Sequence, residues 1–402
     1  DFGGTLGGPV VKDKAHFFYS LDRIVYAEGR SNIFPSRPEL NYSNTQTMRL
    51  WNHMVRFDHQ ISPNQTWSGR YLVEYSPTYD RVARKETPAG RDQEFDIDRS
   101  TGGNFNSVFG NTRFNQLRIG YTHEKNGFTA PELQHGQMMV DVAPTLSMLT
   151  FFDGPNNGAL FRIDNAYELS ETFTQFKPGW GGDHNFKFGA QYIYSEINLP
   201  DQTDMNGRFA FSTDKPFNAS DPSTYPERLF IRVPAPSNIA MPTHVAVMFA
   251  QDQWRRQSLT MNLGVRYDLE MTPISNGFNP LFAKGEYAVD KNNIAPRLGI
   301  TWNPGGSSKS LVRGGYGIFY DKITLQTTTP FVSTGVYSSS FTAQFPNSAA
   351  DPGPSRGAFP TDSMLVNGPV VNRALLNTFL AMFLRFLDCR FVIPTMLIDG
   401  FD

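Results

Sequence analysis

The connections between the predicted strands of this chain alternate strictly between short turns and long loops. The short turns lie at 62–64, 110–111, 178–183, 255–258 and 303–308. The long connections are rich in proline, glycine and asparagine and span 28–44, 77–99, 125–159, 198–240 and 271–290. An antiparallel meander built in this way places every short turn at one rim and every long loop at the other. This arrangement is typical of an up-and-down transmembrane β-barrel, whereas a soluble sandwich has no reason to sort its loops by length.

The sequence predicts about eleven strands, most of them ten residues or longer. They span 15–27, 46–60, 64–76, 101–109, 112–124, 160–176, 183–197, 243–255, 258–270, 292–302 and 309–321. Ordinary globular strands are shorter. A tilted strand of about ten residues is long enough to cross the hydrocarbon core of a membrane.

The predicted strands alternate between apolar and polar residues with a period of two. In 262–269, for example, Leu263 and Val265 take one face, and Gly264 and Arg266 take the other. Aromatic residues on the apolar face often lie near strand ends, where their rings suit the two membrane interfaces. These aromatics are Tyr71, Tyr75, Tyr121, Tyr192, Tyr267, Trp302, Tyr316 and Tyr320.

Composition agrees with a wall that has one apolar and one wet face. Aromatic residues make up 14% of the chain, yet the mean hydropathy is only −0.39. A large secreted all-β protein has a similar composition, so this alternative stays open. The formal charge of −2 gives no reason to expect a nucleic-acid partner. No run of 18 apolar residues predicts a transmembrane helix, and no signal peptide precedes Asp1, so we expect a longer precursor.

The residues that usually carry catalysis or bind metals show no productive spacing. The single cysteine, Cys389, excludes an internal disulfide. His53 and His59 share a strand face but lie about 20 Å apart, too far for one metal ion. The acid pairs at 96/98 and 201/204 are expected in loops as solvated charges, since neither fits a calcium-binding loop. We therefore expect no cofactor, no metal site and no enzymatic activity.

Four segments, in order along the chain, resemble TonB-dependent outer-membrane receptors, and most closely the Oar-like group with a carboxypeptidase-regulatory-like N-terminal domain. They are DFGGTLGGPVVKDKAHFFYSLD at 1–22, HNFKFGAQYIYSE at 184–196, FAQDQWRRQSLTMNLGVRYDLE at 249–270 and NNIAPRLGITWNPGGSSKSLVRGGYGIFYD at 292–321. The likeness covers about 1–325. It implies an outer-membrane location, contact with lipid and lipopolysaccharide, a plug domain inside the barrel, and an inner-membrane TonB-type complex that drives uptake of a nutrient.

The resemblance also implies a division of the chain. Residues 1–14 correspond to the junction between plug and barrel, 15–325 to the barrel and 326–372 to a long extracellular loop. Such transporters have 22 strands, so about eleven strands correspond to an incomplete barrel. The tail at 373–402 lacks the period-two pattern. It is either an amphipathic surface helix or, as we favour, sequence foreign to the family.

Two sets of residues are candidates for ligand contact. The first is expected on the wet, lumen-facing side of the wall, either along the substrate path or in cross-strand pairs within the wall. Its members are Arg56, Asp58, Arg118, Arg266, Asp268, Arg297 and Arg313. The second set consists of loop aromatics that either stack against a ligand or pack the loops together. Its members are Tyr79, Phe128, Phe151, Phe152, Phe217, Tyr225 and Phe278.

The sequence thus favours the barrel portion of a TonB-dependent receptor. Two other functions stay open: an outer-membrane adhesion or signalling barrel without energy coupling, and a secreted carbohydrate-active β-protein.

Overall fold

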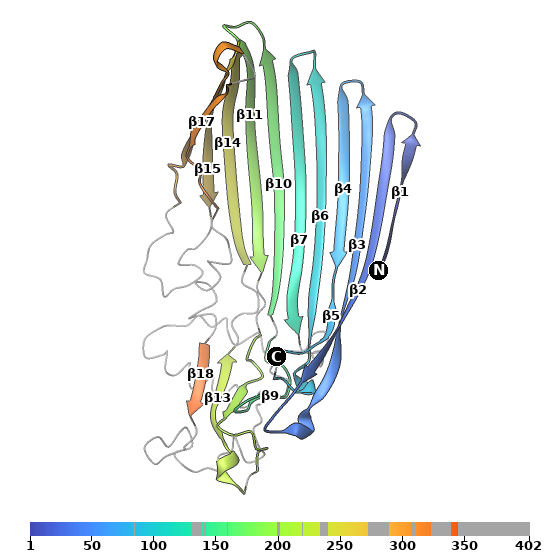
Figure 1. Ribbon diagram of the computed structural model, residues 1–402, viewed down its shortest axis with the longest axis vertical. Helices are drawn as coiled ribbons and strands as arrows, with labels where there is room; N and C mark the ends of the chain where they lie inside the picture. Colours follow the sequence, from blue (N-terminus) through green and yellow to red (C-terminus); the bar gives the residue numbers. More distant parts are fainter. Residues whose placement is uncertain are drawn as a thin grey trace, which may run out of the picture.

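The computed structural model describes residues 1–83, 85–129, 139, 142–158, 160–198, 202–218, 220–233, 240–271, 289–306, 310–322 and 339–344. These residues form a tall antiparallel wall and a smaller second sheet below it (Figure 1). The rest of the described chain consists of turns, loops and single turns of 3-10 helix. Nowhere in these ranges does a helix have the length and apolar character needed to span a membrane.

The wall is a 13-stranded sheet whose main strands follow one another in sequence order, each antiparallel to the last. Its strands are β1 (Phe2–Val11), β2 (Ala15–Asn32), β3 (Tyr42–Ser62), β4 (Gln65–Tyr75), β5 (Thr78–Arg81), β6 (Asp92–Phe109), β7 (Arg113–Thr129), β10 (Leu160–Lys177), β11 (Asp183–Asn198), β14 (Ala240–Arg256), β15 (Leu259–Met271), β16 (Ile294–Trp302) and β17 (Val312–Gly317). The short β5 pairs with β3 and β6 off the main path. The predicted all-β meander is confirmed, and β1 and β17 are the terminal strands of an open sheet.

The hairpin turns of the wall all lie at one rim, and the long connections lie at the other (Figure 1). This confirms the sorting of loops that the sequence predicted. Tight turns at the upper rim use positive backbone φ angles, such as 60° at Gly110 between β6 and β7. Glycine adopts this conformation without strain because it has no Cβ atom.

All eleven predicted strands are present, although several differ in length from the prediction and one further strand was not predicted. The segment 1–14, interpreted as a plug–barrel junction, carries the unpredicted strand β1, paired with β2. Its glycines gave no strand signal, and backbone pairing along one edge is enough to hold it. Strand β6 begins at Asp92 instead of 101. Asp96 and Asp98, expected in a loop, therefore lie on a strand, because a wet strand face accepts charged residues as readily as a loop does.

Strand register assigns the side chains to two faces. One row across the sheet contains Arg56, Arg70, Gly102, Gly120 and Glu168. The adjacent row, which points to the opposite face, contains Val55, Tyr71, Thr101, Tyr121 and Tyr167. The wall therefore has one polar face and one apolar face. The polar face is the concave one.

The position of Lys322, which comes soon after β17 at the far edge of the sheet, indicates which side of the wall is enclosed. Lys322 lines the same hollow as Arg56 of β3 and Arg118 of β7. The chain beyond the far edge of the sheet thus lies on the polar side of the wall, as expected if this side encloses the wet lumen of a barrel. The convex face carries exposed Leu263, Val265 and many other large apolar side chains.

Tyrosines form a girdle on the convex face toward the loop rim. Tyr121 and Tyr167 are neighbours with ring centroids 4.8 Å apart. Four hydroxyls in this girdle bond to polar side chains two residues nearer the loops: Tyr19 to His53 at 2.9 Å, Tyr121 to Asn165 at 3.0 Å, Tyr192 to His244 at 2.7 Å and Tyr194 to Glu196 at 2.7 Å. The rings thus lie in apolar surroundings while their hydroxyls point to water, which places the membrane boundary at this level.

The long loops fold together into a packed unit, here called the loop cap. Its 5-stranded sheet contains β8 (Thr145–Ser147), β9 (Phe152–Asp153), β12 (Arg208–Phe211), β13 (Pro226–Val233) and β18 (Ser339–Gln344). Strand β18 comes from the segment predicted as the long loop at 326–372, and the tail at 373–402 lies outside the described residues. The most deeply buried large side chains belong to this cap: Phe34, Val82, Met139, Met205, Phe209, Leu229 and Ile231. The dry core is therefore in the cap, and the wall instead has an apolar convex face suited to lipid.

Candidate functional site

A row of carboxylates crosses the concave face of the wall near the loop rim. Glu74, Asp98, Glu124 and Asp164 are successive partners on β4, β6, β7 and β10. Three of them, Asp98, Glu124 and Asp164, line a hollow of about 570 Å³ together with Arg162, Ser195 and Lys322. This hollow is here called the acidic recess.

The acidic recess contains polar atoms that have no partner among the described residues. They are Asp164 Oδ1, Arg162 Nε and Ser195 Oγ, all three buried. Arg162 and Asp164 form an ion pair through their remaining polar atoms, and Asn126 donates to Glu124 at 2.6 Å. Buried polar groups normally have hydrogen-bond partners. The wall of the recess therefore contains donors and an acceptor that are left unpaired, beside a hollow large enough for a polar ligand.

A second hollow of about 630 Å³ continues along the concave face toward the short-turn rim. Arg56, Arg70 and Arg118 line it, and Glu168 is its carboxylate. Lys322 belongs to both hollows. The charge on the concave face thus changes from acidic near the loops to basic further down the wall.

All seven residues predicted to face the lumen lie on the concave face according to strand register. Arg56 donates two hydrogen bonds of 2.8 Å to Asp58, and Arg266 forms a similar pair with Asp268. These pairs run along one strand, not across two strands as the alternative interpretation expected. Arg118 lines the basic hollow.

The other two predicted lumen residues lie on the last strands of the wall. The guanidinium of Arg297 lies 4.6 Å from the ring centroid of Phe319. Arg313 is opposite Thr301 in the β16–β17 pair. Sequence reasoning missed the carboxylate row beside them. The sequence did contain a signal for this row, because Asp96 and Asp98 alternate as residues on one face of a strand do. In the sequence analysis this acid pair is instead expected in a loop.

Most predicted loop aromatics contact other side chains. Phe151 packs edge-on against Phe34 with centroids 5.4 Å apart, and Phe217 lies 5.6 Å from Tyr225. Arginine guanidinium groups lie over two more rings, Arg49 over Tyr79 and Arg81 over Phe128. Phe152 remains 39% exposed, and Phe278 lies outside the described residues. These contacts agree with the packing interpretation, and stacking against a ligand stays a prediction.

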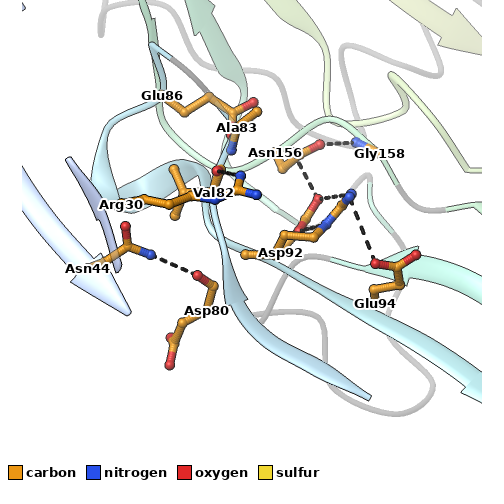
Figure 2. Close-up of polar contacts among 11 residues, drawn as sticks. Arg30, Asn44, Asp80, Val82, Ala83, Glu86, Asp92, Glu94, Asn156 and Gly158 are labelled. Carbon is orange, nitrogen blue, oxygen red and sulfur yellow. Dashed lines mark hydrogen bonds and ion pairs between the residues drawn. The ribbon is translucent and has the colours of Figure 1, made fainter. Parts of the chain in front are cut away.

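An arginine-centred network joins the wall to the loop cap (Figure 2). Arg81 of β5 holds Asp92 of β6 with two hydrogen bonds, at 2.8 and 3.0 Å, and lies 3.9 Å from Glu94. Asn156, from the β9–β10 connection, donates to Asp92 at 3.4 Å and accepts from the backbone N–H of Gly158 at 2.7 Å. The network therefore joins the β9–β10 connection of the cap to the loop end of the wall.

Neighbouring strands hold the segment that follows β5. Arg30 of β2 donates to the carbonyl of Val82 at 3.1 Å, and Asn44 of β3 donates to the carbonyl of Asp80 at 2.9 Å (Figure 2). The Glu86 carboxylate accepts the backbone N–H of Ala83 at 2.9 Å. Burial raises the pKa of Glu86 above its ordinary value. Among the described residues, no group of three or more potential ligands is arranged to hold a metal ion.

The family described as "Outer membrane beta barrel domain" matches residues 35–386 of the chain. The chain belongs to this family. The β-barrel is therefore located in the outer membrane, and its convex apolar face lies against lipid. A comparison with curated proteins gave no match.

Among solved structures, the chain is similar to the outer membrane transporter YddB from Escherichia coli, with a TM-score of 0.63 and 13% sequence identity. The likeness covers 84% of this chain and 40% of YddB. The chain also matches the ferric enterobactin receptor PfeA from Pseudomonas aeruginosa, with a TM-score of 0.46, 11% identity, and coverage of 78% of this chain and 40% of PfeA. At such identities the likeness to YddB concerns the fold alone. This outer membrane β-barrel thus spans less than half the length of either protein.

Proposed function

We propose that this chain forms the barrel wall and the loop cap of a TonB-dependent receptor that takes up a nutrient across the outer membrane. The observation that carries the proposal is the acidic recess, where the atoms Asp164 Oδ1, Arg162 Nε and Ser195 Oγ are buried without partners among the described residues. A barrel that served only as a membrane anchor has no need of such a recess. The similarity in fold to an outer membrane transporter supports the same conclusion.

In this proposal the loop cap captures the nutrient and the concave face guides it inward. The ligand would meet the carboxylates of Asp98, Glu124 and Asp164 before the arginines further down the wall. A polar ligand with hydroxyl or cationic groups matches this first surface, since carboxylates accept hydrogen bonds from both. The process is gated transport without bond chemistry, driven through a plug domain by a TonB-type complex. The ordered resemblance of four segments to the Oar-like group supports this energy coupling.

The test is uptake of radiolabelled nutrients by a deletion strain that carries the intact gene on a plasmid. Cells should accumulate one nutrient class only with the gene, and lose that accumulation when the proton-motive force is collapsed. Growth on defined carbon and metal sources identifies the class. Binding to cells that persists without any accumulation would instead favour an adhesion or signalling barrel.

Residue variants connect uptake to the acidic recess. Asp164→Asn should lower accumulation at limiting nutrient by about tenfold, because a hydrogen bond to a charged group contributes about 1.5 kcal/mol. Asp13→Asn is the matched control, since Asp13 lies in the β1–β2 turn with a φ of 60° that asparagine also tolerates. Outer-membrane levels of both variants are compared by immunoblot. Equal uptake by the two variants would mean that the acidic recess has no role in nutrient uptake.

A further inference from the structure

The convex face of the wall carries a band of basic residues just beyond the tyrosine girdle. Strand register places His53, Arg99 and His123 in one row, and Arg23 and Lys125 in the next row toward the loops. Arg49 follows one row further, opposite Val25. In these three rows from β2 to β10, the described convex face carries no aspartate or glutamate.

The concave face at the same level has the opposite charge. Asp22 and Glu74 on β2 and β4 belong to the same level as Asp98, Glu124 and Asp164. From β2 to β10 the two faces are thus sorted by sign, with bases outside and, apart from Arg162 in its ion pair with Asp164, acids inside. The acids face the wet lumen. The bases face the zone where the tyrosine hydroxyls leave the hydrocarbon, which is the level of lipid headgroups.

Arg99 is the central cation of this band. Its side chain is exposed, and it makes no ion pair with any described residue, whereas most other arginines near the loop rim do. His123 is its direct cross-strand partner on β7. An exposed guanidinium beside an imidazole, without a neighbouring carboxylate, is suited to a phosphate group, which arginine binds with two parallel hydrogen bonds.

An apolar groove of about 510 Å³ lies on the same convex face, below Arg99 in the direction of the short-turn rim. Gly69 and Gly103 are cross-strand partners at its floor. Phe57, Trp67, Leu117 and Ile119 are among its walls. Gly103 lies four residues from Arg99 on one face of β6, about 13 Å away. This spacing connects a headgroup position to an acyl-chain position along a single strand.

We propose that the convex faces of β3 to β7 bind one phosphorylated lipid of the outer leaflet, with its phosphate on Arg99 and one acyl chain in the groove between Gly69 and Gly103. Because the convex face carries the basic residues, it favours a negatively charged headgroup. The groove selects a lipid over a free anion. This site does not depend on transport, because it lies on the opposite face from the acidic recess.

The test uses the full-length protein, purified in a mild detergent and studied by native mass spectrometry. The probes are bis-phosphorylated lipid A, the same lipid without phosphates, and inorganic phosphate. Arg99→Gln should weaken binding of the phosphorylated lipid about fivefold, the contribution of one basic residue near an anionic headgroup. Gly103→Leu should weaken binding of both lipids by filling the groove. Its new side chain meets Ile119 first, at 3.1 Å, and that exposed residue has room to move.

Arg113→Gln is the matched control, because Arg113 lies on the convex face of the same hairpin at the opposite rim. It should bind the phosphorylated lipid as the unmodified protein does. The dephosphorylated lipid should bind equally to the unmodified protein and to Arg99→Gln. Heat-modifiable migration on gels confirms that each variant is folded.

Three results would overturn the proposal. Equal losses for Arg99→Gln and Arg113→Gln would mean general attraction between charges and no site. Binding of inorganic phosphate that depends on Arg99 but is not displaced by the lipid would mean a free-anion site. Unchanged affinity of Gly103→Leu for both lipids would mean that no acyl chain occupies the groove, and the assignment to a lipid would then fail.

Discussion

Arg81 and Asp92 form a two-pronged ion pair that joins β5 to β6 where the wall meets the loop cap. The nitrogen atoms Nε and Nη2 of Arg81 lie 2.8 and 3.0 Å from the two carboxylate oxygens of Asp92. The Asp92 side chain is only 8% exposed. The same guanidinium lies 4.2 Å from the ring centroid of Phe128 on β7. One side chain therefore connects three wall strands at the point where the cap is attached.

Replacing Arg81 should loosen the loop cap while leaving the wall in place. Arg81→Gln leaves the buried Asp92 carboxylate without its cation, which should cost about 2 kcal/mol of local stability. Amides of 82–91 should then exchange with deuterium faster, by a factor of about 30. Arg91→Gln is the control. Its ion pair with Asp80 at 3.3 Å is half-exposed on both sides and should contribute less than about 1 kcal/mol.

A hydrogen-exchange pattern that is the same in Arg81→Gln and Arg91→Gln would contradict this role of Arg81. Faster exchange throughout β6 and β7 would also contradict it, because the damage would then not be confined to the cap.

The convex face of the wall should reject charge. Val265 lies on this face in β15 and is exposed to the lipid phase. Val265→Lys should destabilise the barrel by about 2–4 kcal/mol, the penalty for a lysine facing lipid near the midplane. Folding into lipid vesicles, monitored by urea titration, measures the change. Gln251→Lys is the matched control, because Gln251 lies on the concave face of β14, opposite Gly264. Equal midpoints for the two variants would mean that the faces have been assigned the wrong way round.

The wall was predictable from sequence because its two constraints are local. Alternation of residues such as Leu263, Gly264 and Val265 shows which face meets lipid, and the spacing of turns gives the topology. Both the alternation and the turn spacing can be recognised in the sequence without any knowledge of distant contacts. The side assignment of Arg56, Arg118 and the other lumen candidates follows from the same alternation.

The loop cap was not predictable in this way. Its core brings together Phe34, Met139, Phe209 and Leu229 from three separate connections of the wall, and no local pattern shows which loops meet. The carboxylate row was missed for a related reason. Asp96 and Asp98 have a loop-like composition, and only pairing with β7 shows that they belong to a strand. A strand that faces the wet lumen can be as polar as a loop. The difference in polarity by which sequence analysis separates strands from loops is then lost.

Phe151 should be a main support of the loop cap. It is 3% exposed and packs against Phe34 from the β2–β3 connection. Phe151→Ala should cost about 3–5 kcal/mol, the usual range for removing a buried phenylalanine. The loss should appear in the cap alone, because the wall does not depend on this side chain. Phe152→Ala is the neighbouring control, since Phe152 is 39% exposed and its backbone pairing in β9 survives the change. Limited proteolysis of both variants measures the difference, and equal cleavage rates would refute the packing role of Phe151.

Asp214 should make the attachment of two cap loops dependent on pH. Its carboxylate accepts the backbone N–H of Thr150 at 2.9 Å and the Thr150 hydroxyl at 2.6 Å. Burial acts to raise the pKa of Asp214, but hydrogen bonds from Ser36 and Thr150 outweigh it and hold the pKa below its ordinary value. A carboxyl group with a lowered native pKa stabilises the fold fully above the unfolded value near 3.9. This stability is lost as the pH falls through the native pKa.

Protease cleavage near Thr150 should therefore increase below about pH 4. In Asp214→Asn the cleavage should be faster at pH 7, by about fivefold for a contribution of about 1 kcal/mol, and should vary less with pH. Asp221→Asn is the control. Asp221 also has a lowered pKa, but its hydrogen bonds at 3.0 and 2.8 Å go only to Ser223 within its own turn. If cleavage near Thr150 responded to Asp221→Asn as strongly as to Asp214→Asn, the pH dependence would belong to the cap as a whole and not to the Asp214–Thr150 contact.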